Sequence, residues 1–280
     1  MRVTPLQDER VIVSRLVFIY ILLFLAWRFF LNTTPSHLLQ PQLFVLNIDL
    51  TYWLYRFSGI AGIITSQTGA VIFDVLIFSF CILSILFPRR RLFIIPFSIL
   101  FLLYAITYNT FIVHHAHPLA IMTIITLPFW CRKNESWKML WEGMRYYICL
   151  VYFMLFIWKI LPGNAFLYMD QGIGTVKYNL AEYIYHYPSA MMTSVYKFFI
   201  SHPFTLTIGN ICIILLEGVM ITGLFTKRYD RYLLWIPVVI HVSTYFFSDV
   251  FFIEWLVLVF VFFTPAQINA VAKKIPLIAK

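Results

Sequence analysis

Charged side chains are scarce in this chain. Only 12% of the 280 residues are Asp, Glu, Lys or Arg, whereas about 25% is usual for a soluble domain. Hydrophobic residues make up 61% of the chain and aromatic residues 19%. This balance excludes a sizeable soluble domain and predicts an integral membrane protein whose main partner is the lipid bilayer. We expect residues 1–280 to form a single integral membrane domain.

Cysteine is also rare, and the four cysteines, at positions 81, 131, 149 and 212, are widely spaced. The absence of a C-x-x-C pair leaves no visible dithiol for thiol–disulfide chemistry. There is no H-E-x-x-H motif either, and no carboxylate lies close to the histidine cluster at 114–117. We therefore expect no metal, although imidazole is a common metal ligand and a site at this cluster is the alternative.

The chain has few acidic residues, and its formal net charge is +9. The basic residues fall in short clusters between apolar runs, which is typical of the positive-inside rule and speaks against a nucleic-acid partner. At the N-terminus, Asp8 and Glu9 interrupt the basic segment and Arg28 lies at the end of the apolar run. This pattern favours a retained helix over a cleaved signal peptide.

Long apolar runs are what the sequence does have. About 20 apolar residues are needed to span a bilayer, and shorter runs can cross inside a bundle. We predict an all-α fold, a polytopic transmembrane helix bundle with about eight spans. The run 232–264 is divided at Ser248 and Asp249, because about 50 Å of helix is too long for one crossing. The expected spans are 11–31, 69–87, 92–113, 119–130, 144–161, 204–225, 232–247 and 250–264.

Eight spans place both termini on one side of the membrane. On the other side lie segment 32–68, expected as an interfacial hairpin, and segment 162–203, with an amphipathic piece near 189–200. Sixteen of the 21 basic residues then share the side of the termini. The other five are Arg28, Arg56, Lys159, Lys177 and Lys197. This asymmetry predicts cytoplasmic termini, in a membrane that we expect to be the bacterial cytoplasmic (inner) membrane.

Several ionisable residues fall inside the expected spans, where such residues mark function by default. At 1.5 Å per residue, Lys159 lies about 3 Å from the outer end of its helix, Asp74 about 7 Å and His241 about 9 Å. Glu217 is deeper, at about 20 Å. Each has a structural alternative: Glu217 can be a hydrogen-bonded packing residue, and His241 can be a neutral interhelical hydrogen-bonder. For Asp74 we predict a structural ion pair with Arg28, because both lie in the outer layer of the expected spans.

Lys159 comes two residues before the sequence Leu161-Pro162-Gly163, which ends its apolar run. One interpretation is a lysine that extends its amine to the headgroups. The other is a desolvated lysine that gives up its proton and acts as a base.

The surroundings of Lys159 resemble a known family. Tyr152-Phe153, five residues, Lys159-Ile160, then Gly163 and 169–172 (MDQG) resemble a segment of the membrane domain of the vitamin K-dependent γ-carboxylases, the HTTM family. The resemblance continues in order and covers about residues 105–265. It includes the histidines at 114–115, Glu217-Gly218, 223–225 (GLF), His241, Phe251 and 264–265 (TP).

The resemblance implies a chemistry and a site. Lys159 would be the base acting on a reduced, vitamin K-like quinone, with His241 and His115 as further catalytic residues. The supporting residues of this prediction are His114, His117, Glu217, Asp74 and Arg28. The lysine is single and no soluble peptide-binding domain follows, so a peptide or protein substrate would come from another chain.

Two other functions compete with a quinol-dependent carboxylase-like or oxidoreductase activity. The chain can be a non-catalytic membrane partner, such as a maturation or export subunit. It can also be a DoxX-like subunit of quinone-linked electron transfer.

Overall fold

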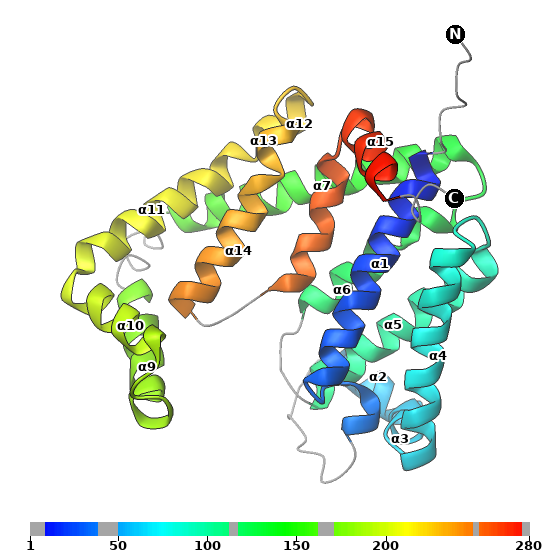
Figure 1. The fold of residues 1–280 in the computed structure, drawn as a ribbon, viewed down its shortest axis with the longest axis horizontal. Helices are drawn as coiled ribbons and strands as arrows, with labels where there is room; N and C mark the ends of the chain where they lie inside the picture. Colours follow the sequence, from blue (N-terminus) through cyan, green and yellow to red (C-terminus); the bar gives the residue numbers. More distant parts are fainter. Residues whose placement is uncertain (1–8, 39–49, 112–116, 162–170, 249–251, 276–280) are drawn as a thin grey trace. The chain divides into compact units, whose positions relative to one another are not determined.

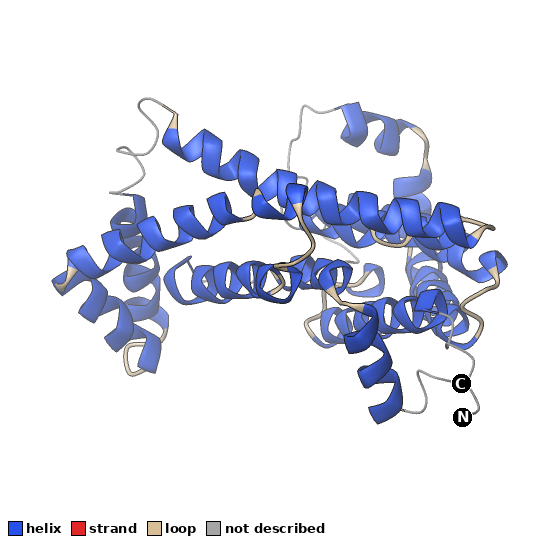
Figure 2. Cartoon of the chain, turned by 90° about the horizontal axis from the view of Figure 1, so that it is seen from above, coloured by secondary structure: helices blue, strands red, loops and turns tan. Residues whose placement is uncertain are grey.

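The computed structural model describes residues 9–38, 50–111, 117–161, 171–248 and 252–275, and every regular element within these ranges is a helix (Figures 1 and 2). This confirms the predicted all-α class. Five helical stretches are long and apolar enough to cross a membrane, or six if the consecutive helices η3 and α15 count as one broken span. The chain is therefore membrane-embedded, while the count of eight spans stays a prediction.

The chain divides into two compact units. Unit 1 comprises Met1–Trp141 and Thr264–Lys280, and unit 2 comprises Glu142–Phe263. Helix α7 (Asn134–Ile160) begins in unit 1 and continues into unit 2. The expectation of one membrane domain over the whole chain stays a prediction beside this division.

Unit 1 is built on three long helices, α1 (Glu9–Phe30), α4 (Gln67–Leu86) and α5 (Arg91–Phe111). Helix α4 packs against both α1 and α5. The aromatic rings of Phe18 and Phe97 meet edge to face with their centres 5.3 Å apart, a favourable arrangement for two buried rings. Shorter elements follow in α6 (His117–Ile124) and η2 (Leu127–Trp130), and α5 packs on both.

The ends of these helices follow from local sequence. The Ser66 side chain accepts a hydrogen bond from the Gly69 backbone N–H, which caps the start of α4. The helix ends at Leu86, two residues before Pro88, because a proline cannot continue a helix. Helix α15 (Pro265–Lys274) begins with a capping box between Thr264 and Gln267 and packs on α1.

Segment 32–68, predicted as an interfacial hairpin, contains η1 (Pro35–His37), α2 (Leu50–Phe57) and α3 (Ile60–Ile64), while residues 39–49 lie outside the described ranges. Helix α2 packs on α5, where the buried Tyr55 hydroxyl lies 2.6 Å from the Thr107 hydroxyl. Burial raises the pKa of Tyr55. These contacts hold part of the predicted hairpin against the unit.

Unit 2 contains the continuation of α7 and a series of shorter helices. These are α9 (Gln171–His186), α10 (Met191–Ser201), α11 (Pro203–Val219), α12 (Thr222–Phe225), α13 (Asp230–Leu233), α14 (Trp235–Ser248) and η3 (Ile253–Phe262). Helices α9 and α10 pack on each other around Val176, Tyr196 and Leu206. Within the predicted extramembrane segment, residues 171–186 and 191–201 are thus helical, and α10 coincides with its predicted amphipathic piece.

Candidate functional site

One face of α7 carries the contacts of the candidate site. Arg145, Cys149, Tyr152, Phe156 and Lys159 recur at steps of four and three residues, so they form a single stripe along the helix. Each of the five contacts a residue of the α11–α14 region in unit 2. The stripe therefore brings ionisable groups from distant parts of the sequence together.

Lys159, in the last turn of α7, forms an ion pair with Glu217, in the last turn of α11. The lysine Nζ donates to both carboxylate oxygens, at 2.6 Å and 2.8 Å. The Glu217 side chain is 3% exposed and the Lys159 side chain 23% exposed. The amine is thus directed at a buried carboxylate inside the unit, and part of the lysine stays accessible.

Two glycines allow the backbone that carries Glu217 to approach α7 closely. A Cβ atom on Gly218 would lie 3.0 Å from the Phe156 ring, and one on Gly223 would collide with the Cys149 sulfur and lie 3.0 Å from Leu233. Small residues at helix contacts are typical of membrane proteins, because association there depends on close packing. These contacts hold Glu217 opposite Lys159.

The second pair of the site lies two turns earlier on α7. The Tyr152 hydroxyl and His241 Nε2 are 2.8 Å apart, and both residues are buried. The imidazole stacks at 26° on the Trp255 ring of η3, and Phe252 meets its edge. His241 is 7% exposed, and its Nδ1 atom is buried without a hydrogen-bond partner in the described part of the chain. This nitrogen can therefore still donate or accept one hydrogen bond.

The two pairs belong to one site. Tyr152 and Lys159 lie two helical turns apart on the same face of α7, so their partners His241 and Glu217 both lie against that face. A lysine, a carboxylate, a phenol and an imidazole thus follow one another in a buried, aromatic surrounding. These four groups can hold a proton, pass it on and orient a polar ring.

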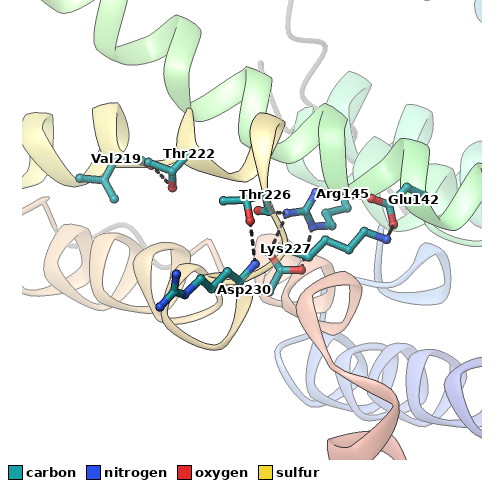
Figure 3. A network of polar contacts seen from close by, with 8 residues as sticks. Glu142, Arg145, Val219, Thr222, Thr226, Lys227 and Asp230 are labelled. Atoms are coloured by element: carbon teal, nitrogen blue, oxygen red, sulfur yellow. Dashed lines mark hydrogen bonds and ion pairs between the residues drawn. The ribbon is translucent and has the colours of Figure 1, made fainter.

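A third polar cluster lies at the beginning of the stripe (Figure 3). The buried Arg145 guanidinium donates from Nε and Nη2 to the two carboxylate oxygens of Asp230, at 2.9 Å and 2.7 Å, and from Nη2 to the Thr226 carbonyl, at 2.9 Å. Lys227 pairs with Glu142 at the more exposed edge of this cluster. The bidentate pair between Arg145 and Asp230 joins α7 to α13, and this geometry indicates a structural role.

Sequence reasoning missed three members of these clusters as site residues, namely Tyr152, Arg145 and Asp230. Arg145 entered only the count of basic residues on the side of the termini, and Asp230 entered no prediction. The available signal was the heptad spacing along α7, which sets polar residues 145, 152 and 159 on one face.

The depths predicted for Lys159 and Glu217, about 3 Å and about 20 Å from the outer end of a span, were wrong relative to each other. The two side chains are hydrogen-bonded and therefore lie at one level. The error came from counting each apolar run from a common membrane boundary. Helix α7 ends beside Glu217, whereas α11 continues from Glu217 back to Pro203, about 21 Å further.

Asp74 and Arg28 are separate from this cluster because both lie in unit 1. The two hydrogen bonds that Asp74 Oδ2 accepts come from the Thr34 hydroxyl and the Ser36 backbone N–H, at 2.9 Å and 3.1 Å. The Arg28 guanidinium lies 4.1 Å from the centre of the Tyr108 ring. Among the described contacts, these partners stand in place of the predicted ion pair between Asp74 and Arg28.

Only part of the histidine cluster at 114–117 lies within the described residues. His114 and His115 lie outside the described residues, and His117 is the first residue of α6 in unit 1. Within the ranges that the structure describes, no three His, Cys, Asp or Glu side chains gather as a metal site would require. The roles predicted for these histidines stay predictions.

An apolar groove of about 560 Å³ lies in unit 2, along α11 to α14. Apolar and aromatic side chains line it, among them Leu216, Val219, Tyr232, Trp235 and Val239. A groove of this size and character is suited to a hydrocarbon chain.

The fold and these clusters define a class: an all-helical membrane protein with a Lys–Glu pair whose carboxylate is buried, and a buried Tyr–His pair on the same face of α7. Comparison with models of known protein families, with characterised proteins and with solved structures finds no match to this chain. The function is therefore argued from the site itself.

Proposed function

We propose that the chain is an HTTM-type membrane protein whose unit 2 binds a reduced quinone and removes a proton from it. The observation that carries this proposal is the contact of Lys159 Nζ with both oxygens of Glu217. The carboxylate is buried, and the lysine is 23% exposed. A buried carboxylate that holds a partly accessible amine is an arrangement for exchanging protons with a bound ligand.

The pair can act in two protonation states. When both groups are charged, Lys159 is a cation that attracts the hydroxyl oxygen of a quinol. When the proton moves along the 2.6 Å hydrogen bond to Glu217, a neutral amine and a protonated carboxyl group remain. That amine accepts the proton of the quinol hydroxyl and leaves a quinolate beside an ammonium group.

The neighbouring groups fit a ring with a polar edge and an apolar tail. His241 Nδ1 offers one further hydrogen bond, and Trp255 supplies a flat aromatic surface beside it. The apolar groove along α11 to α14 would take the hydrocarbon tail. We place the protein in the bacterial cytoplasmic membrane, with both termini cytoplasmic.

A second candidate function is a non-catalytic membrane partner, in which the Lys159–Glu217 pair only fixes α7 against α11. The specific observation in its favour is the exposure of large side chains on α9, α10 and the turn between them. Tyr178 is 72% exposed, Tyr185 82% and Met191 74%. Exposed aromatic and methionine side chains are enriched at protein interfaces.

Substitution of Lys159 distinguishes the two functions. Purified protein in nanodiscs would be mixed under nitrogen with a short-tailed naphthoquinol, and quenching of tryptophan fluorescence would report binding. Quinolate formation would be followed by its ultraviolet absorbance. Lys159→Arg keeps a bidentate pair with Glu217 but cannot give up its proton. We expect Lys159→Arg to bind the quinol and form no quinolate, whereas the wild type does both.

The charge-reversed double variant Lys159→Glu/Glu217→Lys is the matched control. It keeps an ion pair between α7 and α11 and moves the amine to the buried position. If the pair is only structural, the double variant and Lys159→Arg will both behave as wild type. Equal quinolate formation in wild type and Lys159→Arg, or no quinol binding at all, would sink the acid–base proposal and leave the partner function in front.

A further inference from the structure

Unit 1 contains a second pocket, which the proposed function does not use. It has a volume of about 320 Å³ and is lined by Arg10, Arg89, Arg91, Arg132, Cys131 and Asn134. No Asp or Glu is among these described lining residues, so the pocket walls carry four formal positive charges. The acidic residues closest in sequence are Glu9 and Glu135, each next to a lining residue.

The floor of this pocket is built rather than accidental. The guanidinium of Arg10, which is 8% exposed, donates to the backbone carbonyls of Phe129 and Cys131, at 3.0 Å and 2.5 Å, and to that of Arg132 at 3.4 Å. Arg91 donates to the Trp130 carbonyl at 3.5 Å. Two arginines thus hold the segment that carries Cys131 and Arg132 in a fixed shape.

The rim differs from the floor, because Arg89 and Arg132 are exposed. Two long helices also begin at this pocket, α5 at Arg91 and α7 at Asn134. Their N-terminal N–H groups add partial positive charge to that of the arginines. Basic side chains that gather around one hollow favour an anion inside it.

We infer that this pocket binds a phosphate group. Arginine matches phosphate oxygens with its planar, two-pronged donor geometry, and the hollow has room for more than one such group. Two sources can supply this chemistry: the headgroup of an anionic phospholipid, or a soluble phosphate compound. Basic pockets between transmembrane helices on the cytoplasmic side are typical places for anionic lipid headgroups, and the basic-residue count predicts this end of unit 1 to be cytoplasmic.

The chain offers a matched control for the test. Arg90 and Lys133 are the exposed sequence neighbours of Arg89 and Arg132, and neither lines the pocket. The test variant Arg89→Gln/Arg132→Gln and the control Arg90→Gln/Lys133→Gln therefore remove the same charge from the same two loops. Thermal unfolding of the full chain in neutral detergent would be measured against added short-chain phosphatidylglycerol, short-chain phosphatidylcholine and inorganic pyrophosphate.

A bound phosphate raises the unfolding temperature by mass action. We expect phosphatidylglycerol to raise it in the wild type and the control, with its apparent affinity about tenfold or more weaker in the test variant. Phosphatidylcholine should act much more weakly. Stabilisation by phosphatidylglycerol alone would assign the site to a lipid headgroup, and stabilisation by pyrophosphate as well would assign it to the phosphate group in general.

Labelling of Cys131 gives a readout inside the pocket itself. In a Cys212→Ser background the two other cysteines, at 81 and 149, are buried. We expect phosphatidylglycerol to slow the reaction of Cys131 with N-ethylmaleimide in the control but not in the test variant. Equal weakening in both double variants would show only a general surface charge effect. That result, or no response to either anion, would overturn the site.

Discussion

The buried pair between Arg145 and Asp230 gives the sharpest prediction about stability in unit 2. Arg145 is 2% exposed and Asp230 8%, and two hydrogen bonds of 2.9 Å and 2.7 Å join them. Asp230→Asn leaves a buried guanidinium whose remaining acidic neighbour is Glu142, at 3.4 Å. Removing one partner of a buried pair costs about 3–5 kcal/mol, because the other charge stays buried without compensation.

That loss corresponds to about two to four orders of magnitude in the unfolding equilibrium, at 1.4 kcal/mol per factor of ten. The double variant Arg145→Met/Asp230→Leu removes both charges and fills the space with apolar groups. Replacing a whole buried pair in this way is often neutral or stabilising. We therefore expect each single variant, Arg145→Met or Asp230→Asn, to be much less stable than the double variant.

The neighbouring pair between Lys227 and Glu142 is the internal control, since its side chains are 63% and 28% exposed. Exposed pairs contribute about 0–1 kcal/mol, so Lys227→Met should change little. The assay is reversible unfolding in mixed micelles with increasing sodium dodecyl sulfate, followed by tryptophan fluorescence. Single variants as stable as Lys227→Met, or a double variant less stable than both, would refute the reasoning.

Two further predictions concern packing and topology. Gly223→Ala should destabilise unit 2 by about 1–3 kcal/mol, because the added methyl group would meet the Cys149 sulfur and Leu233. The same micelle assay measures this loss. Gly209→Ala is the control, because open space surrounds Gly209. Cysteines placed at the exposed residues Ser66 and Lys177 should react with an impermeant maleimide from outside the cell, and one at Glu135 only from inside. Labelling at Glu135 from outside would contradict the eight-span topology.

The helices were the predictable part of this molecule. Apolar runs of sufficient length form helices in a bilayer whatever their partners are, since every backbone group must be paired within the segment. The predicted spans 69–87 and 92–113 correspond to α4 and α5 within a few residues. The choice of labelling positions also depended on the structure. From the sequence, Asn179 is a natural position for an outside label, but it is 6% exposed, whereas the adjacent Tyr178 is 72% exposed.

The partners of the polar residues were the unpredictable part. A charged residue in an apolar run must find a partner, but the sequence does not say which one. Lys159 and Glu217 are 58 residues apart, and Asp74 has hydrogen-bond partners from the segment before it where we predicted Arg28. A pairing of this kind depends on how far one helix is shifted along its neighbour, and hydropathy carries no information on that shift.

The glycines of unit 2 supply that missing information. Gly218 lies against Phe156 and Gly223 against Cys149, so two small residues of the α11–α12 region receive two larger residues of the α7 stripe. Without a hydrophobic driving force between helices in lipid, such contacts and polar pairs set the position of one helix along another. A shift of one helical turn, about 5.4 Å, would separate Lys159 from Glu217 and Arg145 from Asp230 together. The packing that stabilises unit 2 and the geometry of the proposed acid–base pair therefore depend on the same two glycine contacts.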